Sequence, residues 1–343
     1  MIYDESYSRF IYSNLPHRTN SEMDRGPQFV ESWCKRYGVW DHPVTRHRFI
    51  DADPARIVSY SYPDAHGPDL DLAFSMMNIY LAVDDAFESA YWNNAHPEGA
   101  RFIRSMVDVV VSSAEDYVHS PPLVRAFADV WRESRAGMSE SWRARAAHTW
   151  CRYLWGYVME SIVQSRGLTI TPDEYLLKRR WIIGTAPCFD MLERAHGYEL
   201  PEVVASLEFI DEFRYLGADI IILCNDVASV PKDLHRGDTS NMVLLLSARG
   251  SSIEQSLTEV GDMIERKLQQ YLSKRDELSD VLAALDLGEA EMSVVFRYVD
   301  EILEWCGANL DWQGQILRYY GKANALLADS GHMSELATAP GDT

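Results

Sequence analysis

The stretch EVVASLEFIDEFRYLGADIIILCNDV, residues 202–227, lies between Pro201 and Pro231 and has the length of a long helix. In its latter half the sequence becomes apolar on nearly all sides of such a helix. A helix of this kind belongs at the centre of a bundle, because only there does protein cover all of its faces. We therefore expect residues 202–227 to form a core helix.

The rest of the chain is predicted to be helical as well. In residues 252–272 apolar side chains recur at steps of three and four, with charged residues between them, which is typical of an amphipathic helix. The run MVDVVVSS, residues 106–113, has strand propensity, but its apolar residues also fit one face of a helix, and we expect a helix there. These patterns predict an all-α fold built as a helical bundle.

The placement of prolines and the absence of a linker segment predict one domain. Prolines are absent between Pro122 and Pro172 and between Pro231 and Pro340, which leaves room for long helices. No internal repeat or low-complexity linker divides the chain. We expect a single domain over residues 1–330 and a flexible C-terminal tail over residues 331–343.

Composition narrows the range of partners and compartments. The 343 residues carry a formal net charge of −20, which disfavours nucleic acid and anionic membranes as partners. The five cysteines are widely spaced and lack a C-x-x-C pair, so neither a zinc site nor a disulfide framework is expected. No apolar run approaches the length of a membrane-spanning helix, and the N-terminus does not resemble a signal peptide. The sequence therefore predicts a soluble cytoplasmic protein.

An acidic motif ends one of the apolar segments. Residues 81–89, LAVDDAFES, place Asp84, Asp85 and Glu88 after a run that reads as a buried helix. Offsets of one and four residues put the three carboxylates on one side of a helix end. Acidic triplets also arise by chance in a chain with 52 Asp and Glu residues, so position matters more than pattern here. Because buried carboxylates are costly unless they are paired, we expect a positive group to face them.

A second cluster of oxygen side chains follows about 140 residues later. In CNDVASVPKDLHRGDTSN, the residues Asn225, Ser229 and Asp233 recur every four positions and form one stripe along a helix. Hard oxygen donors of this kind suit Mg²⁺, although they could also be ordinary polar groups at a helix end. Pro231 removes one helical hydrogen bond and is expected to bend or end the helix close to them.

Together these motifs resemble the metal-binding pair of class I terpene synthases, particularly the bacterial ones. YLLKRRWIIGTAP resembles the family segment that holds a diphosphate-sensing Arg and an effector Gly, here Arg180 and Gly184. NLDWQGQILRYY resembles its C-terminal Arg-Tyr pair, here Arg318 and Tyr319, preceded by the aromatic Trp312. ARIVSYSYPDA resembles the stretch ahead of the acidic motif, and HRGDTSNMV resembles the loop after the second motif. These segments occur in the family's order and span most of residues 15–322, and the resemblance implies a helical bundle around a central apolar active-site cavity.

The resemblance implies an Mg²⁺-dependent enzyme, with three ions in each active site, that ionises a linear isoprenyl diphosphate and cyclises the carbocation to a terpene. It implies Asp84, Asp85, Glu88, Asn225, Ser229 and Asp233 as metal ligands, with Asp84 the most direct one. Arg180, Lys232, Arg318 and Tyr319 would bind the diphosphate, where Arg can form bidentate bonds. The aromatic faces of Tyr80 and Trp312 would stabilise the carbocation, and Phe189 is a weaker candidate for the same role.

Two positions depart from the family pattern. Asp233 stands where the family usually has Glu, and its shorter side chain must bring the backbone nearer the metal or bind through water. The aromatic pair often found before the acidic motif is reduced to Tyr80, with Leu81 beside it. The first departure concerns metal affinity and the second concerns the substrate.

Small residues at pocket-lining positions slightly favour the C20 substrate, geranylgeranyl diphosphate, over the C15 farnesyl diphosphate. Gly217, Ala218, Ala186 and Cys188 are the small residues in question. Two other readings remain open: a trans-prenyl diphosphate synthase, which would need a second D-D-x-x-D motif, and a non-catalytic helical interaction protein. The product and the oligomeric state do not follow from the sequence, and a homodimer is compatible with it.

Overall fold

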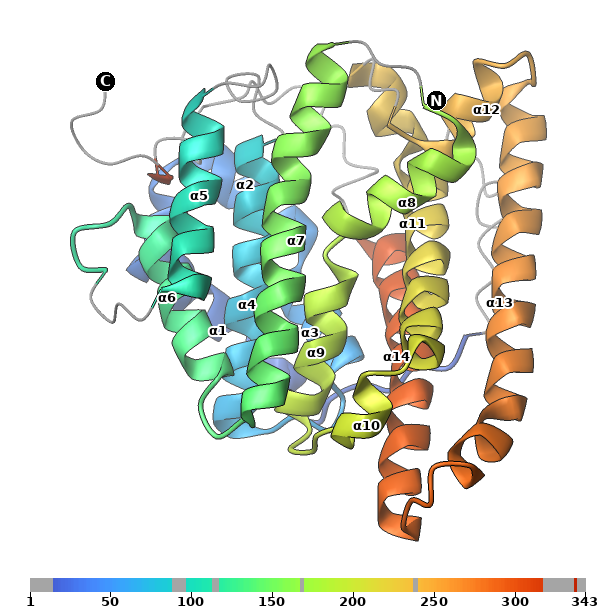
Figure 1. Cartoon of the computed structure of the whole chain (residues 1–343). Coiled ribbons are helices and arrows are strands. Elements are labelled where there is room, and N and C mark those ends of the chain that lie inside the picture. The colour runs from blue at the N-terminus through green and yellow to red at the C-terminus, as the bar shows by residue number, and fades with distance from the viewer. Residues whose placement is uncertain are drawn as a thin grey trace. The chain divides into compact units, whose positions relative to one another are not determined.

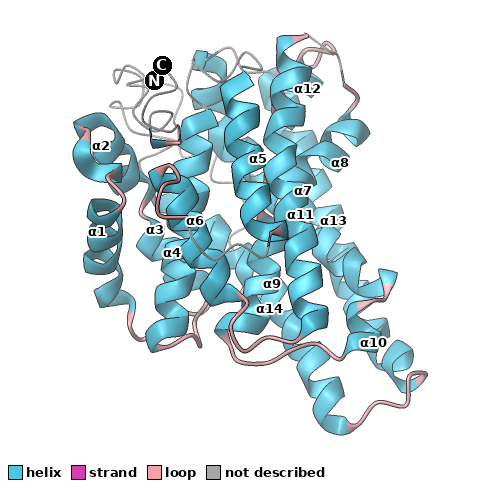
Figure 2. Cartoon of the chain, turned by 60° about the vertical axis from the view of Figure 1, so that its left-hand side comes forward, coloured by secondary structure: helices cyan, strands magenta, loops and turns pink. Residues whose placement is uncertain are grey.

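The regular secondary structure of the described residues is helical. The computed structural model describes residues 15–87, 97–112, 117–166, 170–236, 240–316 and 336–337. Within these ranges only helices and the turns between them occur (Figure 2). The predicted all-α fold is therefore confirmed. None of the helices in the described part of the chain combines the length and apolar character that a membrane crossing requires.

The chain groups into two compact units, which are described separately here. One comprises Asn20–Thr169 with Leu326–Thr343, and the other comprises Ile170–Ala325 with Met1–Thr19. The single domain expected over residues 1–330 stays a prediction. Of the expected tail, residues 331–343, the described residues include only 336–337.

The first unit is a bundle in which α4 packs against α1, α3 and α6, while α5 packs against α6 and α7 (Figure 1). Most residues of α4 are buried, as expected of a helix inside a bundle. Its helices are η2 (Met23–Arg25), α1 (Gly26–Arg36), η3 (Val39–Asp41), α2 (Pro43–Ala52), α3 (Pro54–Ser61), α4 (Gly67–Phe87), α5 (Pro97–Val111), α6 (Pro122–Ser134) and α7 (Glu140–Ser165). The ambiguous run over residues 106–113 lies mostly in α5, so its prediction as helix is confirmed.

Prolines begin helices in this unit and do not interrupt them. Pro43, Pro54 and Pro122 each occupy the first position of a helix. A proline is well tolerated there because the first turn of a helix leaves its N–H groups without partners in the helix anyway. The proline-rich first part of the sequence thus encodes several short helices.

The second unit is built around α11, which contacts α8, α9, α12, α13 and α14 (Figure 1). The predicted core helix is therefore confirmed. Residues 220–224 are all at most 3% exposed, in agreement with the apolar run. The helices of this unit are α8 (Pro172–Ile182), α9 (Thr185–Ala195), α10 (Glu202–Ala205), α11 (Glu208–Arg236), α12 (Met242–Ser247), α13 (Ile253–Ala283) and α14 (Glu289–Gln315).

The expected core helix differs from the observed one at both ends. It is divided after Ala205, where the Ser206 hydroxyl donates to the Val203 carbonyl at 2.9 Å and so offers the backbone an alternative to helical bonding. At the other end α11 continues through Pro231 to Arg236. A helix-interior proline costs roughly 3 kcal/mol. Val227 and Val230, in the turn just before the proline, are completely buried, and their burial offsets this cost.

The N-terminal segment of the described chain crosses α14. A Cβ atom at Gly307 would lie 2.6 Å from the Pro16 carbonyl oxygen, so only glycine allows this close approach. Arg18 pairs with Glu304 at 2.9 Å, and His17 lies 3.4 Å from Asp311. The residues just before Thr19 thus bind a helix nearly 300 positions later in the chain.

Candidate active site

The acidic motif occupies the C-terminal end of α4. Asp84 is half-buried and Asp85 is 2% exposed, and the helix ends at Phe87. The helix is almost entirely buried up to this point because the residues from Met76 to Val83 are apolar apart from Asn78. Two of the three predicted carboxylates therefore lie together at a helix end, and Glu88 lies outside the described residues.

Aromatic rings fill the turn below Asp84. The Tyr80 ring stacks on Trp150 with centroids 5.2 Å apart and meets Tyr153 edge-on at 4.9 Å. The hydroxyls of Tyr153 and Tyr157 are 2.9 Å apart, and Phe87 packs on the Tyr157 ring at 4.8 Å. Burial, with neighbouring Tyr153 and Asp84, raises the pKa of Tyr157 well above its usual range, so this phenol stays neutral. The interior below the acidic motif is thus lined by bulky rings from α4 and α7.

The second oxygen cluster lies near the end of α11. The Ser229 hydroxyl donates to Asp233 Oδ2 at 2.5 Å, and both side chains are buried, at 4% and 7% exposure. Asn225 is half-buried one turn earlier. The predicted stripe of three oxygen side chains is present because α11 does not end at Pro231.

Asp226, which was not among the predicted site residues, connects this end of α11 to α8 and α12. Its carboxylate accepts hydrogen bonds from the Tyr175 hydroxyl at 2.9 Å and from the Met242 backbone N–H at 2.8 Å. Burial raises the pKa of Asp226 to about 7, although Arg179, Met242 and Tyr175 act to lower it. One side chain therefore connects α11 to both α8 and the start of α12.

The adjacent arginines of α8 have different partners. Arg180 makes a bidentate ion pair with Asp219 of α11, at 2.6 and 2.7 Å, and lies over the Tyr215 ring at 5.1 Å. Arg179 instead extends toward the oxygen cluster, with Nη2 3.5 Å from Asn225 Oδ1. Arg179 therefore lies beside a predicted metal ligand, and the diphosphate-sensing role expected of Arg180 stays a prediction.

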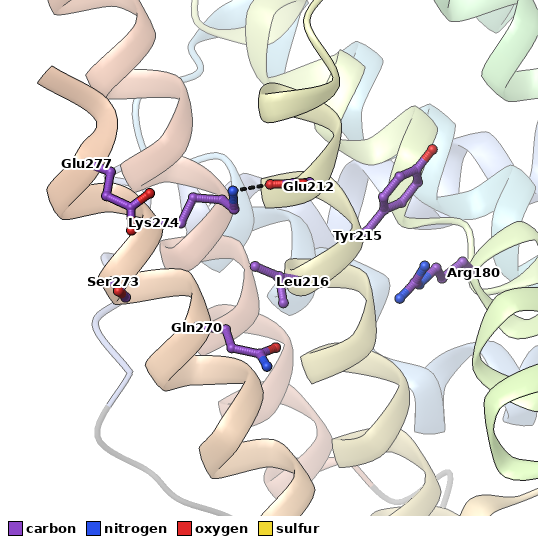
Figure 3. Close-up of a pocket in the computed structure, with 8 residues that line it drawn as sticks. All are labelled: Arg180, Glu212, Tyr215, Leu216, Gln270, Ser273, Lys274 and Glu277. Carbon is purple, nitrogen blue, oxygen red and sulfur yellow. Dashed lines mark ion pairs between the residues drawn. The ribbon is translucent and has the colours of Figure 1, made fainter. Parts of the chain in front are cut away.

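Arg180 also lines a surface groove between α11 and α13. Figure 3 shows Arg180 and Tyr215 on one side, and side chains of α13 on the other. Lys274 of α13 pairs with Glu212 of α11 inside the groove. Its lining residues are Arg180, Glu212, Tyr215, Leu216, Gln270, Ser273, Lys274 and Glu277. The groove is lined by two cations, Arg180 and Lys274, and two carboxylates, Glu212 and Glu277. It therefore lacks the excess of positive charge that would attract an anion.

The predicted effector Gly184 is the N-cap residue of α9 and has a left-handed conformation, with φ of 78°. Glycine adopts such a conformation without the steric cost that a Cβ atom imposes. Arg214 of α11 holds the first turn of α9, because it donates to the Ala186 carbonyl at 3.0 Å and to Asp190 at 2.8 Å. The position of the α9 start is therefore set from α11.

The predicted pocket aromatics of this unit are buried. Trp312 is 7% exposed on α14. Phe189 is fully buried and meets Trp305 edge-on at 6.0 Å. A Cβ atom at Gly217 would lie 2.7 Å from Ile302 Cγ2 and 3.3 Å from Phe189 Cζ. Gly217 is thus the point where α11 and α14 approach closely, and Phe189 packs into the same contact.

Three further assignments can be placed only in part. Lys232 is half-buried on α11, between Pro231 and Asp233. Arg318 and Tyr319 lie outside the described residues. Within the described residues, no group of three His, Cys, Asp and Glu side chains is arranged to hold a metal. The second motif supplies only one carboxylate, since its other two donors are an amide and a hydroxyl.

The donor chemistry nevertheless fits Mg²⁺. Asn225, Ser229 and Asp233 offer only oxygen atoms, and the last two are buried together. Mg²⁺ prefers such hard donors and usually retains waters or substrate phosphate oxygens in its remaining positions. A site with one carboxylate and two neutral donors on α11 therefore suits a metal that is shared with an anionic ligand.

Comparison with known proteins decides between the alternatives. Residues 75–270 match the family described as "Terpene synthase family 2, C-terminal metal binding". This match covers more than half of the chain and includes both oxygen clusters. The chain belongs to this family. It is accordingly an enzyme, and metal binding by its terpene synthase domain follows from the same match.

Terpene synthases from Saccharothrix and Streptomyces align over most of the chain. A (−)-β-caryophyllene synthase from Saccharothrix espanaensis, named as cyclising (2E,6E)-farnesyl diphosphate, is 33% identical, over 84% of this chain and 82% of its own length. Pentalenene synthase from Streptomyces arenae is 29% identical, over 94% and 96%. The crystal structure of linalool/nerolidol synthase from Streptomyces clavuligerus with 2-fluorogeranyl diphosphate has a TM-score of 0.79 at 27% identity, covering 89% of this chain and 98% of that one. The fold is that of class I terpene synthases.

Sequence reasoning missed three residues that connect the second oxygen cluster of α11 to neighbouring helices. Asp226 follows Asn225 directly, and its place in the motif could have signalled a role. Asn241 precedes the apolar run MVLLL, a pattern that predicts a helix cap. Nothing in the sequence pattern singles out Tyr175. Each of them acts through hydrogen bonds between distant segments, which local spacing does not encode.

Proposed function

We propose that this terpene synthase ionises farnesyl diphosphate in the presence of Mg²⁺ and cyclises the resulting carbocation. The observation that carries the choice of a C15 substrate is the aromatic cluster below Asp84. Tyr80, Trp150, Tyr153 and Tyr157 gather in the turns below Asp84, and bulky rings at this place would leave less depth for a longer isoprenoid chain. The name of the relative from Saccharothrix espanaensis supports the same substrate.

The sequence-based preference for geranylgeranyl diphosphate is not confirmed. It rested on small residues along the predicted pocket, among them Gly217. Gly217 packs against Ile302 and Phe189, so its small size serves the contact between α11 and α14. The volume argument therefore loses one of its supports, and the aromatic rings act in the opposite direction.

The proposed magnesium ligands are Asp84 and Asp85 of α4 and Asn225, Ser229 and Asp233 of α11, with Glu88 as a further candidate. We propose three ions per active site, as the family resemblance implies. When bound, Mg²⁺ would act as a Lewis acid that stabilises the negative charge of the departing diphosphate. Lys232, Arg318 and Tyr319 are proposed to bind diphosphate oxygens, together with Arg179, whose guanidinium lies beside Asn225.

The apolar and aromatic side chains have a separate task. A carbocation reacts with water, so the walls that receive it must exclude water and offer no nucleophile. The faces of Tyr80 and Trp312 are proposed to stabilise the cation by about 0.5–2 kcal/mol each. Gly184, at the start of α9, is proposed to have the effector role that the resemblance implies, with the first turn of α9 held by Arg214.

Product analysis tests this proposal. The purified chain is incubated with Mg²⁺ and with equal concentrations of farnesyl and geranylgeranyl diphosphate, and the hydrocarbon extract is analysed. We expect cyclic C15 products as the main fraction and none in excess chelator. Cyclic C20 products as the main fraction would refute the choice of substrate. Full activity in chelator would refute the metal dependence. Sedimentation velocity would test the homodimer, which stays a prediction.

A further inference from the structure

Asn241 connects the metal-binding motif of α11 to the start of α12. The side chain is fully buried, and its amide Nδ2 lies within hydrogen-bonding distance of three oxygen atoms of α11, which share its two N–H groups. These atoms are the Asp226 carbonyl oxygen at 2.7 Å, Asp233 Oδ2 at 3.0 Å and Ser229 Oγ at 3.2 Å. One amide group thus contacts two of the three predicted metal ligands of this motif.

The other end of the same side chain caps a helix. Asn241 Oδ1 accepts hydrogen bonds from the backbone N–H groups of Val243 and Leu244, at 2.9 and 3.4 Å. Backbone N–H groups can only donate, so the oxygen must face α12 and the nitrogen must face α11. The orientation of the amide is therefore determined by its partners on both sides.

We propose that Asn241 is a positioning residue for magnesium binding by Ser229 and Asp233. The inference rests on the proposed function of these two residues as metal ligands. Residues that hydrogen-bond to metal ligands orient them, and their loss commonly weakens metal affinity 10–100-fold. The requirement is acute here because the aspartate at position 233 has a short side chain, which has few rotamers with which to reach a metal.

The three bonds also restrain the geometry of the motif as a unit. The Ser229 hydroxyl donates its proton to Asp233 Oδ2, and Asn241 donates to both of these oxygens. The third bond, to the Asp226 carbonyl, fixes the backbone of α11 at the start of the same turn. Asn241 therefore fixes the Ser229 and Asp233 side chains relative to the backbone of α11. The hydrogen bond between Ser229 and Asp233 alone would not do this.

A purely structural role for Asn241, as the cap of α12, is the alternative to be excluded. Asn241→Ser separates the two roles, because serine is a good N-cap residue but lacks the amide donors and is shorter. Ser252→Ala is the matched control. Ser252 caps α13 in the same unit by accepting from the Gln255 N–H at 3.1 Å, and it forms a capping box with that residue.

The test measures metal binding directly, with Mn²⁺ in place of Mg²⁺ and with inorganic diphosphate present. Mn²⁺ binding to the full-length chain is followed by electron paramagnetic resonance, and the melting temperature of each variant is recorded. We expect Asn241→Ser to raise the Mn²⁺ concentration for half-saturation by about 10–100-fold, as for loss of other residues that orient metal ligands. Its melting temperature should fall no further than that of Ser252→Ala, which should bind Mn²⁺ like the wild type.

The outcomes are distinct. If Asn241→Ser melts at a lower temperature but binds Mn²⁺ within twofold of the wild type, Asn241 is only a helix cap and the proposal is wrong. If the wild type itself does not bind Mn²⁺ with diphosphate, the proposed function fails instead. Should Asn241→Ser not fold, Asn241→Gly serves as the second variant, since glycine is also accepted at N-cap positions.

Discussion

Arg180 and Asp219 form a bidentate ion pair, in which Nε and Nη2 of the arginine donate to the two carboxylate oxygens at 2.6 and 2.7 Å. The Asp219 side chain is fully buried, and Lys267 also contacts it at 2.8 Å. Such a pair is costly to break, because an unpaired carboxylate would remain inside the protein. The arginine that sequence resemblance assigns to the diphosphate therefore has a strong partner within its own unit.

Arg180→Gln should destabilise the protein. Asp219 would keep only Lys267, and removal of one partner from a buried pair costs about 3–5 kcal/mol, with the lower end applying because Lys267 remains. Urea unfolding followed by circular dichroism measures the effect. An unchanged midpoint would show that the pair contributes little.

Arg179→Gln should weaken diphosphate binding in addition to any effect on stability, because Arg179 also interacts with the buried Asp226. Arg179 lies 3.5 Å from Asn225 Oδ1, so we expect it to bind diphosphate, and its loss should weaken that binding about tenfold through one charged hydrogen bond. Calorimetric titration with Mg²⁺ and inorganic diphosphate measures the affinity, with Arg180→Gln as the matched control. If only the control lost affinity, Arg180 would be the diphosphate ligand, as the resemblance suggested.

Asp84→Asn should abolish turnover. The substitution keeps the size of the side chain but removes the charge that a divalent metal requires. The helical circular dichroism should not change. Asp69→Asn, in the first turn of the same helix, controls for loss of an acidic charge from α4 and should retain activity. Wild-type turnover in Asp84→Asn would contradict its assignment as a metal ligand.

Gly217→Ala should destabilise the protein by about 1–3 kcal/mol, since overpacking a filled core has costs of this size. The new Cβ atom would lie only 2.7 Å from Ile302 Cγ2. Gly314 in α14 is the control, because a Cβ atom there meets no atom within 4 Å. Gly314→Ala should stabilise the helix by about 0.5–1 kcal/mol. Equal effects of the two substitutions on the melting temperature would refute the packing argument.

Glu301→Gln should have a pH-dependent effect. Burial alone would raise the pKa of Glu301, but hydrogen bonds from His196, Tyr198 and Arg297 outweigh it and lower the pKa. A lowered pKa means that the ionised carboxylate stabilises the folded state at neutral pH, and that this stabilisation is lost as the pH falls through the folded pKa. The variant should therefore be less stable than the wild type at pH 7, by about 3 kcal/mol. Unfolding curves at pH 7 and below pH 4 should converge at the lower pH; a constant difference would contradict the ionic contribution.

The sequence predicted where helices form better than it predicted which helices pack against one another. The core position of residues 220–224 follows from hydrophobicity, which is a local property. The stripe of Asn225, Ser229 and Asp233 also follows from helical spacing. Continuation of α11 through Pro231 could not be predicted, because it depends on packing by other helices that outweighs the local cost of the proline.

The roles of individual polar residues were harder to predict. Arg179 and Arg180 are neighbours in the sequence, and only the position of Asp219 in α11 separates their roles. Gly217 seemed to provide space for substrate, whereas Ile302 occupies that space in the structure. Both differences depend on segments about 40 to 90 residues away, which spacing within one helix does not reveal.

The contact of Arg18 with Glu304, beside the glycine at position 307, has a consequence for the growing chain. The two residues are 286 positions apart. At about 5–20 residues per second, a ribosome needs roughly 15–60 s to make the intervening segment. Throughout that time the segment around Pro16 has no helix α14 to bind, although most of the helices have already been made. The first described residues of the chain are thus among the last to reach their native contacts.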